Sequence, residues 1–421
     1  MDVLKSLKGH KGNMVNGALF AIFSFVNKGF SFFLLLILAN YIAPVEYGYL
    51  SLFSTVLMLL GYFMAFSTEG YFSLSYLRDG EDASKKVYSN IFATSIVMFF
   101  LLQISLFFGG NSFSRLLSLP KDTLFFAVAT AFLNVYVHTN LEYYRIQEKV
   151  KTYGIFSCGN ALLNFITSIL FVKTFDLGWE GRVYAITGCS AIYGLFALFF
   201  FFKKDFLKRF DPKVWKQMML WGVPLIPHLA SSFLKQGCDR YIINYFHSIG
   251  EVGIFSFALN LTTLITMIGF GFNQSNSVSI YKICSSKNIG TEQKKASLSR
   301  QRNIYILLYT VASVAVVAGC MLLLPFVLPK YTSSLGYLPI LGLYGMLACY
   351  YLVYTNYLFY YKKTKELMYI TVATAILHLL LSLIFTRYSL YITCSIYCFC
   401  QLVKVLFVRR LALKMLQEHL E

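Results

Sequence analysis

The feature that most constrains this chain is its succession of long apolar runs, separated by short loops that carry nearly all of the charge. A membrane-spanning helix needs about 20 apolar residues, and twelve runs are long enough. Only 13% of the 421 residues are charged, whereas an ordinary globular domain carries about 25%. Because so few charges cannot cover a water-exposed surface, we expect an all-α integral membrane protein with twelve transmembrane helices.

The expected spans lie within residues 15–41, 48–74, 87–108, 123–144, 154–175, 182–202, 218–246, 252–280, 303–325, 336–361, 367–386 and 389–408. The loops between them are short, and none is large enough for a separate catalytic domain. We therefore expect a protein that works within the membrane and is not an enzyme. No cofactor and no bound metal are predicted.

The chain is basic, with 37 Lys and Arg against 19 Asp and Glu. These cations gather in clusters between apolar runs, a pattern typical of membrane topology and not of nucleic-acid binding. One side of the predicted membrane, which includes both termini, holds 27 Lys and Arg, and the other side holds seven. Both termini are therefore predicted to be cytoplasmic. Membrane lipids are expected partners, and nucleic acid is not.

The chain also repeats itself. Glu46-Tyr47-Gly48 follows the first predicted span, and Glu251-Val252-Gly253 follows the seventh; an intramembrane lysine precedes each motif, Lys28 the first and Lys235 the second. An offset of six spans gives two halves of the same orientation, related by an axis along the membrane normal. We expect two six-helix lobes, residues 1–210 and 211–421. Such internal symmetry is characteristic of transporters with alternating access.

Several stretches resemble bacterial polysaccharide flippases, and together they cover both halves. The resemblance lies in Asn27-Lys28 with Ala43–Tyr49, in Glu142–Arg145 with Tyr153-Gly154, in Asn160, Asn164 and Gly178–Gly181, and in Gly222–Pro227 through Asp239–Tyr241 to Val252–Phe255. The chain is thus similar to the O-antigen and exopolysaccharide flippases of the multidrug/oligosaccharidyl-lipid/polysaccharide exporter superfamily. The order and spacing of these stretches carry the resemblance, since no single motif is restrictive.

This resemblance, and not the composition, implies a substrate and a location. The substrate would be an undecaprenyl-diphosphate-linked oligosaccharide, such as an O-antigen unit for lipopolysaccharide biosynthesis. It would move from the cytoplasmic to the outer leaflet of the bacterial inner membrane, with coupling to an ion gradient. The polysaccharide polymerase and the chain-length machinery would be further partners.

Charges inside the membrane are costly, so they usually mark a transport pathway or a buried pair. Lys28 is the most isolated of them, and Lys235 occupies a similar place before the second motif. We expect Lys28, with Lys235 and Arg145, to hold the diphosphate of the lipid carrier. The alternatives are that Lys28 pairs with a carboxylate such as Glu69 or Glu142, and that Asp239 neutralises Lys235.

Three further side chains are candidates for ion coupling, namely His138, Glu142 and Glu69. His138 and Glu142 are four residues apart and share one helix face, and an imidazole beside a carboxylate can exchange a proton near neutral pH. A structural hydrogen-bonded pair is the alternative.

Asp239 and Arg240 are interpreted as a pair that locks the lobes or gates the path, with a substrate contact as the alternative.

Two other patterns leave alternatives open. Tyr350, Tyr354 and Tyr357 form one helical stripe that could contact the glycan, but helix packing with an interfacial aromatic belt is the favoured interpretation, because Tyr is abundant throughout the chain. Pro224 and Pro227 should bend or break the seventh span.

Three other protein classes are alternatives to this flippase. A multidrug exporter of the same fold would share the repeat. A peptidoglycan-precursor flippase commonly has more than twelve spans. A membrane-embedded polysaccharide polymerase or acyltransferase would be an enzyme, and a polymerase generally has a large outer loop that this chain lacks.

Overall fold

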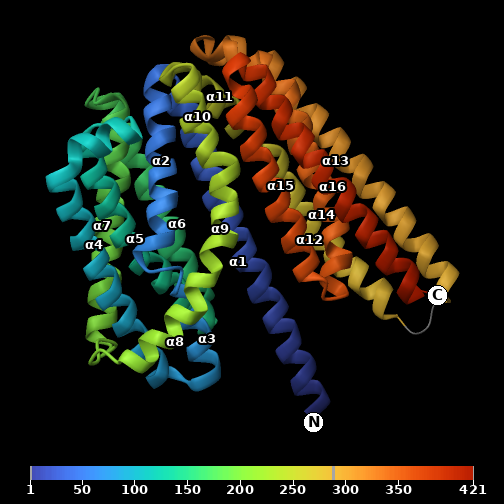
Figure 1. Ribbon diagram of the computed structural model, residues 1–421. Coiled ribbons are helices and arrows are strands. Elements are labelled where there is room, and N and C mark those ends of the chain that lie inside the picture. The colour runs from blue at the N-terminus through green and yellow to red at the C-terminus, as the bar shows by residue number, and fades with distance from the viewer. Residues whose placement is uncertain (1, 287–289, 421) are drawn as a thin grey trace. The chain divides into compact units, whose positions relative to one another are not determined.

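The computed structural model in Figure 1 describes residues 2–286 and 290–420, and nearly all of this chain is helical. Its contacts divide it into two compact units. The first comprises the residues up to Ile42 together with Tyr49–Ala230, and the second comprises Ala43–Gly48 together with the chain from Ser231 onward. The division after Ala230 falls inside a helix, whereas the sequence places the domain boundary at residues 210 and 211.

The first unit is built around long helices. Their bounds are α1 Asp2–Ala39, α2 Pro44–Met64, α3 Glu69–Asp79, α4 Glu81–Leu117, α5 Lys121–Ile146, α6 Val150–Ile169, α7 Gly178–Lys203, α8 Pro212–Gly222 and α9 Ile226–Ser232. A π-helical turn, Leu170–Thr174, extends α6. The first turn of α2 packs with the second unit, and α9 contains the division between the units.

The second unit continues the chain with a π-helical turn at Phe233–Gly237. Its helices are α10 Cys238–Phe246, α11 Ile249–Leu261, α12 Thr263–Ser285, α13 Thr291–Val327, α14 Leu338–Tyr360, α15 Thr364–Phe385 and α16 Leu390–Leu420. Helix α14 lies at the centre of this unit, because it packs on α12, α13 and α16.

Eleven helical stretches in the described ranges are long and apolar enough to cross a membrane. The remaining predicted span, 218–246, forms short pieces: α8, a 3-10 turn at Val223–Leu225, α9, the π-helical turn and α10. Pro224 and Pro227 lie where this helix is interrupted, because proline lacks the N–H that a continuous helix needs. The predicted interruption is present, and one continuous seventh helix is not.

An aromatic cluster stabilises one end of the first unit. Its members, from α3, α4, α5, α7 and the following loop, are Phe72, Tyr88, Tyr143, Phe201 and Phe206, and all five are fully buried. The rings of Tyr88 and Phe201 have centroids 4.2 Å apart. Large aromatic side chains contribute most to packing energy in such cores. The cluster fixes the rotation of α5, which carries three of the predicted site residues, His138, Glu142 and Arg145.

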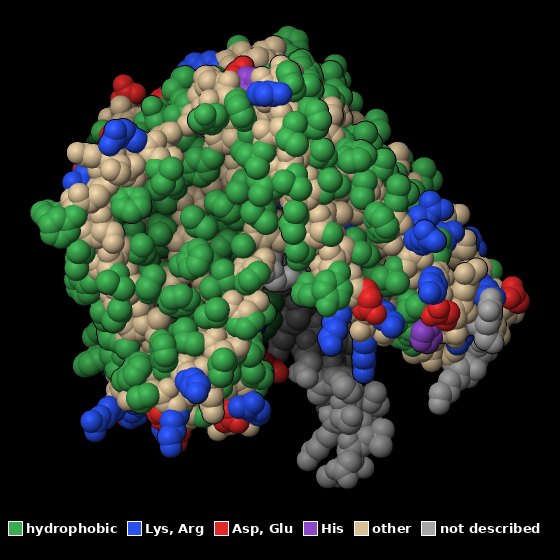
Figure 2. All heavy atoms as spheres, viewed as in Figure 1, with side chains coloured by type: hydrophobic (Ala, Val, Ile, Leu, Met, Phe, Trp, Pro, Cys, Tyr) green, Lys and Arg blue, Asp and Glu red, His purple; other side chains and the backbone are tan. Residues whose placement is uncertain are grey.

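The outward faces of both units are apolar, as Figure 2 shows for one face. On α4, for example, Phe107 and Phe108 are 67% and 83% exposed. Large exposed apolar side chains at this density are unfavourable in water and favourable in lipid. Composition and surface therefore agree on a multi-pass membrane protein.

The two copies of the Glu-x-Gly motif meet inside the second unit. A Cβ atom added to Gly48 would lie 2.0 Å from the carbonyl oxygen of Ile249, and one added to Gly253 would lie 1.8 Å from the carbonyl oxygen of Pro44. Backbone atoms cannot yield to such contacts as a side chain would. Both motifs need glycine so that the first turns of α2 and α11 can touch.

Candidate functional site

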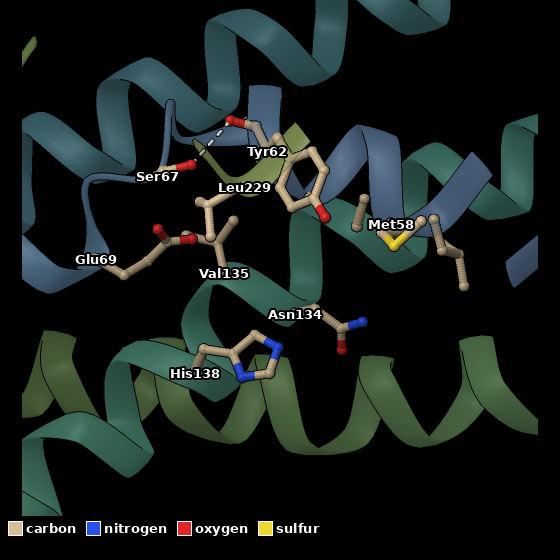
Figure 3. A pocket seen from close by; sticks show the side chains of 11 residues that line it. Met58, Tyr62, Ser67, Glu69, Asn134, Val135, His138 and Leu229 are labelled. Atoms are coloured by element: carbon tan, nitrogen blue, oxygen red, sulfur yellow. Dashed lines mark hydrogen bonds between the residues drawn. The ribbon is translucent and has the colours of Figure 1, made fainter. Parts of the chain in front are cut away.

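The first unit contains a cavity of about 390 Å³ between α2 and α5, closed at one side by the turn before α3 and by α9. Figure 3 shows its lining, in which polar side chains face one another across the space. The labelled residues are Met58, Tyr62, Ser67, Glu69, Asn134, Val135, His138 and Leu229. A cavity lined by polar side chains can hold water or a polar ligand.

Glu69 reaches this cavity because the chain turns sharply after α2. Phe66 and Ser67 have φ values of 50° and 56°, a conformation that side chains other than glycine rarely adopt. The turn ends one helix and starts α3 at Glu69, which places the carboxylate on the cavity wall. Backbone strain of this kind is often found at functional sites.

The opposite wall is α5, where Asn134 and His138 stand one turn apart. The amide oxygen of Asn134 accepts a hydrogen bond of 2.9 Å from the Ser190 hydroxyl, which holds it in place. His138 is exposed to the cavity. The structure therefore brings Glu69 and His138 to one space, although 69 residues separate them in the chain. An acid and an imidazole around a wet cavity can take up and release protons.

Glu142 does not line this cavity. Its carboxylate accepts a hydrogen bond of 3.0 Å from Ser73 and forms an ion pair with Arg145. The Glu142 side chain is 27% exposed and that of Arg145 is 56% exposed. Of the three predicted coupling residues, two thus share the cavity and the third lies one turn away, paired with a cation.

The predicted diphosphate ligands have different surroundings. Lys28 is an exposed residue of α1 in the first unit. Lys235 belongs to the π-helical turn of the second unit, and its carbonyl oxygen accepts a hydrogen bond of 2.6 Å from Tyr397 of α16. Lys404 of the same helix interacts with the Lys235 side chain, and its ammonium lies 4.4 Å from the centre of the Tyr351 ring. The second unit therefore brings two lysines together.

The structure gives Asp239 a contact that the sequence analysis does not consider. The sequence allows Asp239 to neutralise Lys235, one turn away, but its carboxylate lies 2.6 Å from Nε2 of His378 on α15. Both side chains are buried, at 0% and 2% exposure, and the Tyr397 ring packs edge-on against His378. Sequence reasoning missed this contact. The one signal for it is a histidine within an otherwise uncharged apolar span.

The tyrosine stripe on α14 is packed inside the second unit. Tyr354 and Tyr357 are 5% and 1% exposed, and the Tyr350 hydroxyl lies 2.6 Å from that of Thr310. These contacts favour the helix-packing alternative for the stripe.

Outside the spans, the loop after α7 carries a surface ion pair. Lys208 hydrogen-bonds to Asp205, and this bond lowers the pKa of the Asp205 carboxyl.

Within the described residues, no cluster of three or more His, Cys, Asp or Glu side chains has the arrangement of a metal site.

Comparison with known proteins identifies the family of this chain. A family model described as polysaccharide biosynthesis protein matches residues 15–277, which is more than half of the sequence. The chain belongs to this polysaccharide biosynthesis family.

Two proteins of Haemophilus influenzae are similar to this chain over most of their length. A protein of the Lsg locus is 22% identical over 366 residues, covering 85% of this chain and 87% of its own, and a membrane protein is 23% identical over 363 residues, covering 84% and 86%.

Solved structures show the fold. An inward-facing multidrug resistance transporter of the MATE family, in the MOP superfamily, has a TM-score of 0.71 at 15% identity and covers 91% of this chain and 94% of its own. An outward-facing structure of such a transporter has a TM-score of 0.62 at 16% identity, with 96% of each chain covered. The resemblance to the polysaccharide biosynthesis family is confirmed, and the solved structures show that the chain shares its fold with these transporters.

Proposed function

We propose that this member of the polysaccharide biosynthesis family is a flippase for an undecaprenyl-diphosphate-linked oligosaccharide, an O-antigen or similar repeat unit. It would move the unit from the cytoplasmic to the outer leaflet of the bacterial inner membrane by alternating access, coupled to an ion gradient. The observation that carries the proposal is the family match over residues 15–277 of a chain whose helical fold is similar to that of solved transporters. The polymerase and the chain-length machinery would receive the exported unit.

The test is to delete the protein and follow the lipid-linked units. Under the proposal, these units accumulate on the cytoplasmic face while surface polysaccharide disappears. Accumulation on the outer face would indicate a defect in polymerisation and would refute the flippase.

A topology completes this proposal. Twelve spans in two six-helix lobes, related by a pseudo-two-fold axis along the membrane normal, would place both termini in the cytoplasm, as the excess of cations on that side supports. A cysteine in place of Lys149 should be protected from an impermeant reagent applied to intact cells. Labelling of this cysteine from outside would show that the orientation is the opposite of the one proposed. Lys287, a second useful position, lies outside the described residues.

The diphosphate is the part of the substrate that most needs protein charge. It carries about two negative charges, which are costly to move through a low-dielectric interior without cations. We assign it to Lys28, Lys235 and Arg145. Lys28→Ala should abolish surface glycan at normal protein abundance, and Lys28→Arg should retain part of it. Full export by Lys28→Ala would leave that lysine with a structural role.

Coupling is assigned to the first unit, with Glu69, His138 and Glu142 as the groups that exchange an ion during one conformational step. The cavity shared by Glu69 and His138 supports this assignment. Asp239 with Arg240 is retained as a proposed gate pair, and Tyr350, Tyr354 and Tyr357 as proposed glycan contacts.

A multidrug exporter is the second candidate, favoured by the similarity in fold to transporters of that type. A deletion strain that becomes sensitive to cationic drugs while keeping intact surface glycan would support it over the flippase.

A further inference from the structure

Two lysines meet inside the second unit, although they are far apart in the sequence. Lys235 belongs to the π-helical turn Phe233–Gly237, and Lys404 belongs to α16. Their side chains share a hydrogen bond, and both residues are partly buried. The Tyr397 hydroxyl, two turns before Lys404, donates to the carbonyl oxygen of Lys235 and holds the turn against α16.

The hydrogen bond between the two amino groups determines how many protons the pair holds. An ammonium group offers three donors and no acceptor, so one of the two lysines accepts this bond as a neutral amine. Two ammonium groups in contact inside a protein would also repel each other strongly. The pair therefore carries one positive charge and can take up a second proton.

Among the described residues, no carboxylate forms an ion pair with either lysine. Asp239 lies four residues after Lys235, but its carboxylate contacts His378 instead, at 2.6 Å. The titratable and charged side chains near the pair come from the elements packed around it. They are Cys238, Asp239 and Arg240 of α10, Tyr344, Tyr350, Tyr351 and Tyr354 of α14, His378 of α15, and Tyr397, Cys398 and Cys400 of α16. The partner that would balance a second charge must therefore come from a ligand.

A second feature of α16 indicates that this ligand is an anion. Gln401 lies three residues before Lys404, on the same face of the helix, and is only 4% exposed. Its amide nitrogen has no hydrogen-bond partner among the described residues. A buried donor without a partner is unfavourable, and an oxygen acceptor would satisfy it. Two amino groups and one amide thus offer several donors to an anion with several oxygen atoms.

We propose that Lys235, Lys404 and Gln401 form a proton-linked anion site, in which the lysine pair holds one proton when empty and takes up a second when it binds the diphosphate of the lipid carrier. This inference rests on the proposed function, to which it adds Lys404 and Gln401 as ligands and a proton as the ion bound with the substrate. The charge of the diphosphate removes the repulsion that keeps one lysine neutral. The second proton is taken from water and returns to water when the anion leaves.

The first experiment counts protons. The probe is symmetric dimethyl diphosphate, which as a diester lacks the oxygen that titrates near neutral pH in a phosphate monoester. It is titrated calorimetrically into the purified full-length protein in two buffers of different ionisation enthalpy, so that the difference in heat gives the number of protons taken up. About one proton should be taken up per bound anion, and by linkage the Kd should then rise about tenfold per pH unit. Binding without proton uptake, or no binding, would overturn the proposal.

The second experiment repeats this titration with Lys404→Gln. Only Lys235 remains in this variant, and a single lysine is already charged, so the anion should bind at least tenfold more weakly and take up no proton. The matched control is Lys414→Gln on the same helix, because Lys414 is 67% exposed and pairs with Glu418; it should behave as the wild type does. Wild-type affinity or proton uptake in Lys404→Gln would overturn the site.

Gln401→Leu keeps the proposal testable even if Lys404→Gln fails to fold, because it removes a buried amide nitrogen that has no partner. The variant should bind the probe about fivefold more weakly, as expected for the loss of one hydrogen bond, and should still take up a proton. Unchanged affinity would remove Gln401 from the site and overturn the proposal as stated.

A last comparison separates the carrier's diphosphate from a phospholipid head group. Dimethyl phosphate carries one negative charge, as such a head group does, and should bind at least tenfold more weakly than dimethyl diphosphate. Equal affinity would overturn the assignment to a diphosphate. The deletion experiment above decides the flippase separately, because it does not depend on any residue of α16.

Discussion

Among the described residues, Glu69 with His138 in the first unit and Asp239 with His378 in the second unit are two acid–imidazole arrangements whose surroundings differ sharply. In the first unit, Glu69 and His138 line an open cavity of about 390 Å³. In the second unit, Asp239 and His378 touch each other at 2.6 Å and are almost wholly buried. The same two chemical groups can therefore exchange protons with water in the first unit, whereas they are enclosed by protein in the second unit.

The difference teaches what burial does to such a pair. Groups that line a cavity of this size can contact water that enters it, so they can exchange protons with that water. In a buried pair, each group has lost its contact with water and is stabilised by the other group instead. Removing one member therefore leaves the other buried without a stabilising partner. We therefore expect the second-unit pair to dominate stability, and the first-unit pair to affect transport without affecting stability.

The largest effect should come from Asp239→Ala. It leaves the His378 imidazole buried without its carboxylate, and breaking a buried pair in this way costs about 3–5 kcal/mol. The detergent-solubilised variant should show a much lower melting temperature and lower abundance in the membrane. A variant as stable as the wild type would show that the buried pair contributes no net stability.

A smaller effect is expected from Glu142→Gln, because this carboxylate is only partly buried and its partner Arg145 is largely exposed. Loss of one charge-assisted contact should cost about 1 kcal/mol, seen as a modest decrease in melting temperature. Transport with an unchanged dependence on the proton gradient would remove Glu142 from the coupling scheme, whatever its effect on stability.

His138→Ala should change stability by less than about 0.5 kcal/mol, because the side chain is exposed and removal leaves no buried partner. Gradient-dependent export of glycan should nevertheless fall, measured at equal protein abundance. A decrease in melting temperature comparable to that of Asp239→Ala would mean that the two arrangements do not differ as proposed.

The smallest effect is expected at the surface pair of Asp205 and Lys208. Because the folded-state pKa of Asp205 is lowered, its contribution is present at neutral pH and is lost as pH falls through that pKa. Solvent screens such exposed pairs, so Asp205→Asn should leave the melting temperature at pH 7 nearly unchanged. A clear decrease at pH 7 that vanishes in acid would show that the loop contributes more than its exposure suggests.

The membrane class and most helices could be predicted because apolar runs and cation clusters are local signals. The partners of the intramembrane charges could not, because they depend on which helices touch. Asp239 illustrates this limit, since its neighbour by helical spacing was Lys235 and its actual partner, His378, is 139 residues away. The cavity residues Glu69 and His138 were identified as candidates one by one, but the strained turn that brings Glu69 to the cavity has no clear sequence signal.

The contact between the two Glu-x-Gly motifs has a consequence for the origin of the chain. Gly48 meets the carbonyl of Ile249, four residues before Gly253, and Gly253 meets the carbonyl of Pro44, four residues before Gly48. Such reciprocity is the rule at the interface of a symmetric dimer. If each half descends from one ancestral half-length protein, a side chain added at this glycine would have clashed with the partner's backbone at both equivalent contacts. The motif would then record an interface between two separate molecules that gene fusion later enclosed in a single chain.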